Sequence, residues 1–263
     1  MSPSRLALRL CLLATVIIMT TAALADDEKL VTGQFQPHVY TAEDGETLQY
    51  QLLLPENIDD GQKHPLLIFL HGAGERGDDN IAQLKHGRAM MEAQSKKHGA
   101  IILAPQCAKD KRWVEVHWAL PAHTMPEKPS GPMAGVLAVL AQLRAKYNVD
   151  ADRIYVMGLS MGGYGTWDAI QRQPELFAGA VPICGGGDPD GAEAMKDIPI
   201  WVYHGAKDGA VPVARSRQMV EALKKLDAEV HYTEIPDAGH DVWTPAFADE
   251  EMLEWLFSQK KKH

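Results

Sequence analysis

Cysteine is scarce in this sequence. The 263 residues contain three cysteines, and one of them, Cys11, lies in the first 25 residues. No CxxC pair and no Cys/His spacing of the zinc-finger kind occurs, so the sequence predicts no zinc site. Cys107 and Cys184 remain, and two cysteines are able to pair in an exported protein. Burial of apolar side chains must therefore stabilise the fold, and we expect neither a metal nor a cofactor.

Positive charge is also in short supply. Lysine and arginine total 26 against 35 acidic residues, which gives a formal net charge of −9 at pH 7. Removing the first 25 residues, which hold two arginines and no acid, would bring this charge to −11. A chain of this charge is repelled by phosphate backbones and anionic lipids, so we expect no nucleic-acid partner and no binding to anionic membranes.

The apolar run near the N-terminus is too short to span a bilayer. It covers residues 10–19, follows Arg5 and Arg9, and precedes Ala23-Leu24-Ala25. A basic segment, a short apolar core and a small-residue cleavage site predict a signal peptide at residues 1–25 and no stable membrane anchor. We expect residues 26–263 to form a single domain, either secreted or periplasmic. The sequence predicts no particular oligomeric state.

Strand and helix patterns alternate along the rest of the chain. Two strands joined by a turn at residues 43–46 come first, which predicts an antiparallel hairpin. From residue 65 onward, apolar runs of strand length alternate with helical patterns, which is typical of βαβ units. The sequence thus predicts an α/β fold with a mostly parallel central sheet, helices on both faces and an antiparallel N-terminal hairpin. The expected strands are 31–40, 47–54, 65–70, 100–104, 153–158, 177–184, 198–204 and 229–235, and the expected helices are 80–98, 130–147, 161–173, 213–226 and 244–259.

One motif, Gly158-Leu159-Ser160-Met161-Gly162, lies between an expected strand and an expected helix. A serine at such a corner occupies a sharp, strained turn that exposes its hydroxyl at the edge of the sheet. The flanking glycines are needed because side chains there would collide with the neighbouring strand and helix. A hydroxyl is a poor nucleophile at neutral pH, so the chemistry requires a base, and an acid that orients the base.

Candidate partners for Ser160 follow other expected strands. In a doubly wound sheet the working loops leave the carboxyl ends of strands, and Asp208 and His240 both lie in such loops. Their order after the serine is the order of the α/β-hydrolase triad. Asp237 and Asp241 are rival acids, but they adjoin His240 in sequence, whereas the acid is expected on a separate loop.

Other acids and histidines near strand ends are weaker candidates. Asp188 and Asp190 belong to the loop that follows the triglycine at residues 185–187. His71 and His204 each precede a glycine at a strand end, which is too early in the loop to reach the serine as its base. We expect both histidines to be structural.

This motif set resembles the α/β-hydrolase superfamily. The residues that carry the resemblance are 70–77 (LHGAGERG), 104–107 (APQC), 158–163 (GLSMGG), 204–208 (HGAKD) and 239–240 (GH). Within the superfamily, the sequence is most similar to small secreted esterases grouped with the feruloyl and acetylxylan esterases, the phospholipase/carboxylesterase group and the so-called predicted peptidases. The resemblance covers roughly residues 35–258.

The resemblance implies a role for each motif residue. Ser160 would be the nucleophile, His240 the general base and acid, and Asp208 the acid that orients His240. The backbone N–H groups of Ala73 and Met161 would form the oxyanion hole. Since Met161 opens a helix, its N–H has no partner within the helix and points toward developing negative charge.

Aromatic residues near the expected site are candidates for a substrate-binding pocket. They are Trp113, Trp118, Tyr164 and Trp243. Trp113 and Trp118 belong to an irregular segment at residues 106–131, and a loop of this length in a compact domain is usually functional or mobile. Glu75 and Arg76 would pair with each other or contact the substrate, and a local ion pair is the preferred interpretation.

The sequence therefore predicts a serine hydrolase that acts by acyl transfer on a small-molecule or polysaccharide ester, such as an acetyl or feruloyl ester. The alternatives are an exopeptidase with the same triad and a catalytically inactive binding module. In the superfamily's strand order, two strands should separate those that carry Cys107 and Cys184. That separation exceeds the reach of a disulfide and disfavours the pairing.

Overall fold

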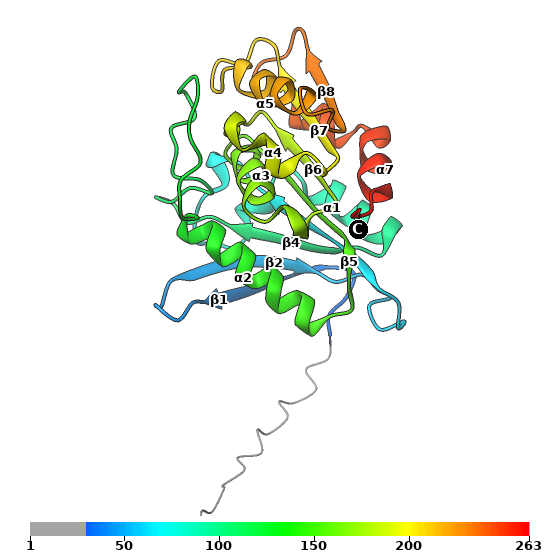
Figure 1. Cartoon of the computed structure of the whole chain (residues 1–263). Helices are drawn as coiled ribbons and strands as arrows, with labels where there is room; N and C mark the ends of the chain where they lie inside the picture. The colour runs from blue at the N-terminus through cyan, green and yellow to red at the C-terminus, as the bar shows by residue number, and fades with distance from the viewer. Residues whose placement is uncertain (1–29, 263) are drawn as a thin grey trace, which may run out of the picture. The chain divides into compact units, whose positions relative to one another are not determined.

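An eight-stranded sheet organises the structure, a computed structural model that describes residues 30–262 (Figure 1). The predicted signal peptide lies outside these residues. The sheet order is β1-β2-β4-β3-β5-β6-β7-β8. The strands are β1 (Phe35–Thr41), β2 (Thr47–Leu53), β3 (His64–Leu70), β4 (Ile101–Gln106), β5 (Val149–Leu159), β6 (Gly179–Ile183), β7 (Ile200–Gly205) and β8 (Val230–Ile235).

Strand direction follows the sequence-based prediction. β1 pairs with β2, and β2 with β4, in antiparallel register, while every other pair is parallel. The predicted α/β-hydrolase fold, with its mostly parallel sheet and antiparallel N-terminal hairpin, is therefore confirmed. β3 and β5 lie between β4 and β6, so Cys107 and Cys184 are far apart, and both are free and buried.

Helices cover both faces of the sheet. They are α1 (Arg88–His98), α2 (Gly131–Lys146), α3 (Met161–Arg172), α4 (Ala192–Met195), α5 (Ala214–Lys224), α6 (Trp243–Phe247) and α7 (Glu250–Ser258), with short 3₁₀ turns η1 (Ala73–Glu75), η2 (Ala82–Leu84), η3 (Pro174–Leu176) and η4 (Pro189–Gly191). Side chains of α2 to α5 join one buried apolar cluster, and those of α1, α6 and α7 join another. None of the helices within residues 30–262 is long and apolar enough to cross a bilayer.

The central strand β3 shows why the sheet needs cover on both sides. All seven of its residues are buried. Leu66, Ile68 and Leu70 pack into the cluster of α2 to α5, whereas Leu67 and Phe69 pack into the cluster of α1, α6 and α7. Successive side chains of a strand point to opposite faces, so a continuous apolar run fits a strand that is sandwiched between two helical layers.

Two of the predicted helices differ from the structure. The helix expected at 80–98 begins only at Arg88. Asn80 has a left-handed φ of 52° and its N–H donates to Gln106 Oε1 at 2.7 Å, and the 3₁₀ turn η2 lies between it and α1. The helix expected at 244–259 is divided into α6 and α7. Asp249 causes the division, because its backbone is extended and its side chain caps α7 by accepting from Met252 N–H at 3.0 Å.

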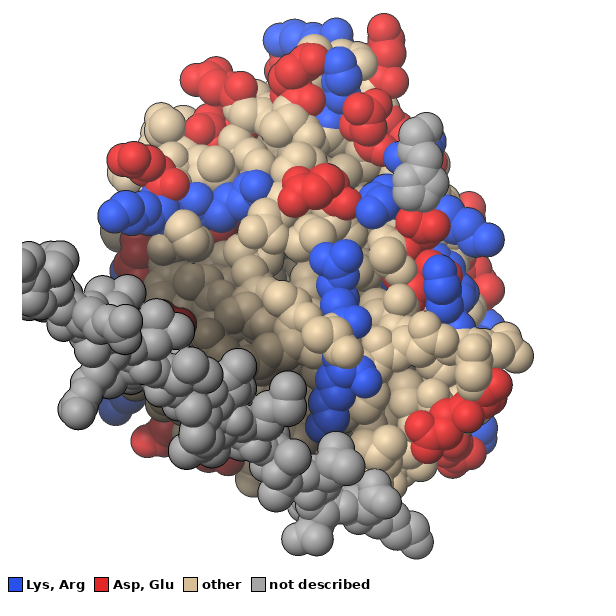
Figure 2. All heavy atoms as spheres, turned by 60° about the horizontal axis from the view of Figure 1, so that its bottom comes forward, with Lys and Arg blue, Asp and Glu red and all other residues tan. Residues whose placement is uncertain are grey.

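Charged side chains of both signs are interspersed on the surface. Figure 2 shows one face, on which lysine and arginine alternate with acidic residues among uncharged surface. Several of these charges form short-range pairs, such as Lys225 with Glu221 at 2.8 Å. Exposed pairs of this kind contribute little to stability, about 0–1 kcal/mol each.

Candidate active site

The turn that carries Ser160 is strained and tightly packed. β5 ends at Leu159 and α3 begins at Met161, which leaves Ser160 between them with φ 54° and ψ −116°. A Cβ atom at Gly158 would lie 2.3 Å from the carbonyl oxygen of Gly162, and one at Gly162 would lie 1.9 Å from that of Leu70. Only glycine fits at either position, which explains the motif that the sequence analysis singled out.

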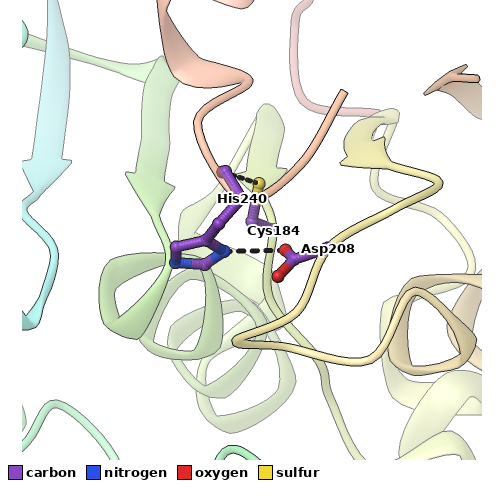
Figure 3. Close-up of side chains that lie close together, drawn as sticks. All are labelled: Cys184, Asp208 and His240. Carbon is purple, nitrogen blue, oxygen red and sulfur yellow. Dashed lines mark hydrogen bonds and ion pairs between the residues drawn. The ribbon is translucent and has the colours of Figure 1, made fainter. Parts of the chain in front are cut away.

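Loops from three strands bring Ser160, Asp208 and His240 together. Ser160 follows β5, Asp208 follows β7 and His240 follows β8. His240 Nε2 lies 2.9 Å from Ser160 Oγ, and His240 Nδ1 lies 2.7 Å from Asp208 Oδ2. Figure 3 shows the edge of the His240 ring facing the Asp208 carboxylate. In this arrangement Nδ1–H donates to Asp208, so the lone pair of Nε2 accepts the hydroxyl proton of Ser160.

Asp208 is held as a carboxylate from two sides. Its Oδ1 accepts from the N–H groups of Ala210 and Val211 at 2.8 and 2.9 Å, and its Oδ2 contacts both His240 and His204. Burial of the side chain opposes ionisation. The hydrogen bonds from the two histidines and the two N–H groups outweigh this effect and lower the pKa of Asp208 below its usual value.

His204 is a second imidazole on the same carboxylate. Its Nε2 lies 3.1 Å from Asp208 Oδ2, and its Nδ1 lies 2.7 Å from Ser216 Oγ. The His204 side chain is fully buried and therefore out of reach of a substrate. It supports the position of Asp208, which agrees with the expected structural role. No sequence pattern indicated that this role would be a contact with Asp208.

His71, the other histidine expected to be structural, ties two loops together. Its Nδ1–H donates to Gly72 O at 2.6 Å, and its Nε2 accepts from Cys107 N–H at 2.9 Å. Because Nε2 serves as an acceptor, a proton on that atom would break the second bond. Burial lowers the pKa of His71 from 6.5 to about 4.

We expect this histidine to make stability fall in mild acid. Its pKa is lower in the folded state, so its contribution is complete above about pH 6.5 and is lost as the pH falls toward 4. This pKa shift corresponds to a contribution of about 3 kcal/mol to the free energy of unfolding. Urea unfolding of His71→Gln should show a shallower loss of stability over this range than wild type. The exposed control His117→Gln should keep the wild-type slope, and an unchanged slope in His71→Gln would contradict the prediction.

A cavity of about 340 Å³ opens beside Ser160 and His240. Trp118 and Trp243, two of the four aromatic candidates for substrate binding, line it. Trp243 also meets the His240 ring edge-on, with ring centroids 5.5 Å apart. Ala73, a candidate oxyanion donor, lines the cavity as the first residue of η1.

Two other aromatic residues predicted to line the pocket do not border this cavity. Trp113 is fully buried, and its Nε1–H donates to the carbonyl oxygen of His71 at 3.0 Å. Tyr164 is also buried, and its hydroxyl donates to the carbonyl oxygen of Trp118 at 2.9 Å. Both residues therefore anchor the irregular segment that leads to Trp118, and neither touches the cavity. Sequence position alone did not separate these anchoring aromatics from the lining ones.

The cavity also contains a pair that the sequence analysis missed. Glu75 and His86 both line it, and Glu75 Oε1 lies 3.1 Å from His86 Nε2. The expected ion pair between Glu75 and Arg76 is wrong, because Arg76 Nε–H donates instead to the carbonyl oxygen of Ala73 at 2.9 Å. His86 lies in a segment that was predicted as a continuous helix, which hid its position beside the cavity.

One group of potential metal ligands coincides with this site. Cys184, Asp208 and His240 offer ligand atoms that all lie within 4.8 Å of one another (Figure 3). The Cys184 thiol donates to the carbonyl oxygen of His240 at 3.1 Å, and burial raises its pKa, so the thiolate that a metal needs is disfavoured. These contacts fit a residue that supports the His240 backbone, and they do not fit a metal centre.

A larger cavity of about 790 Å³ lies away from Ser160, near the start of β3. Several of its charged side chains pair with other residues of the protein. Lys97 lies 2.5 Å from Glu254, Arg153 2.6 Å from Asp150, and Glu92 2.8 Å from Arg88. Size alone therefore does not mark the site, and the smaller cavity beside Ser160 carries the chemistry.

The sheet topology and the Ser–His–Asp contacts at its carboxyl edge define a serine hydrolase of the α/β-hydrolase class. Comparison with known proteins agrees. A family model described as Phospholipase/Carboxylesterase matches residues 57–251, and the chain belongs to this family.

Similar proteins include several esterases. A bifunctional acetylxylan esterase/xylanase from Neocallimastix patriciarum is 24% identical over 226 residues, which cover 78% of this chain and 29% of that protein. Feruloyl esterase B from Neurospora crassa is 30% identical over 122 residues, 45% of this chain and 38% of that one. The crystal structure of a thermostable esterase superposes with a TM-score of 0.76 at 38% identity, covering 86% of this chain and 63% of that chain. The chain thus spans less than two thirds of each of these relatives.

Proposed function

We propose that this protein is a carboxylic ester hydrolase in which Ser160 forms an acyl-enzyme, His240 transfers the protons and Asp208 orients His240. One observation carries the proposal. The two ring nitrogens of His240 lie 2.9 Å from Ser160 Oγ and 2.7 Å from Asp208 Oδ2. This is the geometry that a serine needs in order to act as a nucleophile at neutral pH.

The first half of the reaction acylates the serine. Ser160 Oγ attacks the ester carbonyl carbon while its proton passes to His240 Nε2. The carbonyl oxygen becomes an oxyanion, for which the N–H groups of Ala73 and Met161 are the proposed donors. Losing one such donor typically costs about 10²–10³ in rate. The tetrahedral intermediate then collapses, the bond to the alcohol oxygen breaks, and the alcohol takes the proton from His240 Nε2.

The second half releases the acid. A water molecule attacks the acyl-enzyme carbonyl and passes one proton to His240 Nε2. The bond to Ser160 Oγ breaks, the carboxylic acid leaves, and Ser160 regains the proton from His240. Asp208 stays ionised throughout and balances the positive charge that forms on His240 in each half.

We propose acyl groups on a polysaccharide or a smaller carbohydrate as substrates. The similarity to an acetylxylan esterase and to a feruloyl esterase supports this class. The basic, apolar and small-residue segments of residues 1–25 support export to the periplasm or the extracellular space, where such polymers lie. Residues 26–263 would then be the mature enzyme. Mass spectrometry of the exported protein tests the cleavage site, because cleavage after Ala25 leaves a chain that begins at Asp26.

Parallel assays of esters and amides test the proposed reaction. p-Nitrophenyl acetate and butyrate should be turned over far faster than aminoacyl p-nitroanilides, because an alkoxide or phenolate leaves more readily than an amine. Faster turnover of the anilides would favour the exopeptidase alternative. No turnover of either class, together with no labelling by a fluorophosphonate probe, would favour a binding module.

A further inference from the structure

A second carboxylate–imidazole pair faces the cavity that holds the Ser160 hydroxyl. Glu75 Oε1 lies 3.1 Å from His86 Nε2. The Glu75 side chain is 6% exposed and the His86 side chain is 26% exposed. Both residues line the cavity, and the imidazole is the more exposed member of the pair, with its orientation fixed by the carboxylate.

One atom of His86 is left for a ligand. The bond to Glu75 uses Nε2, and it is the one hydrogen bond that the His86 ring makes within residues 30–262. His86 lines the cavity, and its Nδ1 has no hydrogen-bond partner among these residues. The ring also packs against Trp243, with centroids 5.4 Å apart, and Trp243 meets the ring of His240. A single indole thus connects His86 to the proposed general base.

The chemistry of Nδ1 selects the kind of group that binds. In neutral His86, Nε2–H donates to Glu75, and Nδ1 accepts from an O–H or N–H group. In the protonated form, Nδ1–H donates to an oxygen atom. A hydroxyl group satisfies both forms, because it is both donor and acceptor. A carboxylate could accept a hydrogen bond only from protonated His86. The cavity lining also includes no lysine or arginine that would attract a carboxylate.

We propose that Glu75 and His86 bind a hydroxyl group of the substrate close to the scissile ester. The substrate class is then a hydroxylated ester, with the hydroxyl on the alcohol side, as in a sugar ester, or on the acyl side, as in a hydroxyacyl ester. Trp118 and Trp243, which also line the cavity, supply apolar surface for the carbon skeleton of such a molecule. This inference rests on the proposed ester hydrolysis, and it adds that the site prefers esters that carry a nearby hydroxyl group.

Two pairs of matched esters test the inference and locate the hydroxyl. 2-Hydroxyethyl acetate is compared with propyl acetate for the alcohol side, and methyl 3-hydroxybutyrate with methyl 3-methylbutyrate for the acyl side. In wild type, kcat/KM should favour the hydroxylated member by about tenfold or more in one pair, which is the effect of one well-formed hydrogen bond. The pair that discriminates identifies the side on which the hydroxyl lies.

Variants of His86 show whether the pair is responsible. His86→Phe should bring the ratio within the discriminating pair to about one, and His86→Gln should retain part of it because an amide still hydrogen-bonds. Glu75→Gln should lower the ratio by loosening His86. His231→Phe, which removes an exposed imidazole outside the cavity, should leave the ratio at its wild-type value. Melting temperatures of all variants establish that each is folded.

The outcomes separate the inference from the function on which it rests. If wild type turns over all four esters without preference, or if His86→Phe keeps the wild-type ratio, Glu75 and His86 only tie the loop after β3 to the segment before α1. If no ester is turned over, the proposed ester hydrolysis itself is wrong.

Discussion

Replacing Ser160 with alanine is expected to lower kcat on p-nitrophenyl esters by about 10⁵–10⁶-fold. The serine supplies the atom that becomes acylated, so no other group of the triad can act in its place. Ser160 is half-buried at a turn that glycines already determine, so the smaller alanine side chain should fit the same backbone. The fold should survive, and the loss should come from chemistry alone.

Active-site titration and kinetics together measure this loss. Wild type should react with one equivalent of a fluorophosphonate probe, and Ser160→Ala should not react. Ser258→Ala is a matched control, because Ser258 is an exposed serine at the end of α7. Equal labelling of wild type and Ser160→Ala would show that the nucleophile is a different residue.

Replacing Asp208 with asparagine should lower kcat by about 10⁴-fold without unfolding the protein. The asparagine amide can present its NH₂ group to His240 Nδ1, which then accepts a hydrogen bond and moves the ring proton to Nε2. An Nε2–H faces Ser160 Oγ in that tautomer and cannot take its proton. The loss in kcat thus measures the effect of the wrong His240 tautomer, because the imidazole itself is still present.

Asp237 provides the control for this variant. It was a rival acid in the sequence, but its side chain is 92% exposed and lies 2.6 Å from Lys207 Nζ. Asp237→Asn should therefore keep kcat within about twofold of wild type, as is usual for an exposed pair that contributes little. A loss in Asp237→Asn comparable with that in Asp208→Asn would reassign the acid.

The fold and the group of Ser160, Asp208 and His240 were predictable because each part leaves a local signal in the sequence. Buried strands appear as apolar runs, the turn requires glycines at fixed positions, and loops at the carboxyl ends of parallel strands meet. The order of Ser160, Asp208 and His240 along the chain was then enough to propose their contact. In the structure, His240 lies within hydrogen-bonding distance of both Ser160 and Asp208.

The parts that sequence analysis missed depend on contacts between distant segments. Trp113 and Trp118 lie five residues apart in one irregular segment, yet only Trp118 lines the cavity. Which of the two is buried depends on the packing of that segment against α3, where Trp113 lies beside Gly165. The pair of Glu75 and His86 is similar, because it forms only when the chain between them leaves the helical path that its periodicity suggested.

The double support of Asp208 has a consequence for how the protein responds to acid. Two imidazoles and two backbone N–H groups keep this carboxylate ionised well below the pH at which an ordinary aspartate takes up a proton. Asp208 therefore keeps its negative charge, and with it its hydrogen bond to the His240 ring, in mild acid. Loss of the Asp208 charge should therefore not contribute to any fall in rate between neutral pH and the pH at which an ordinary aspartate is protonated.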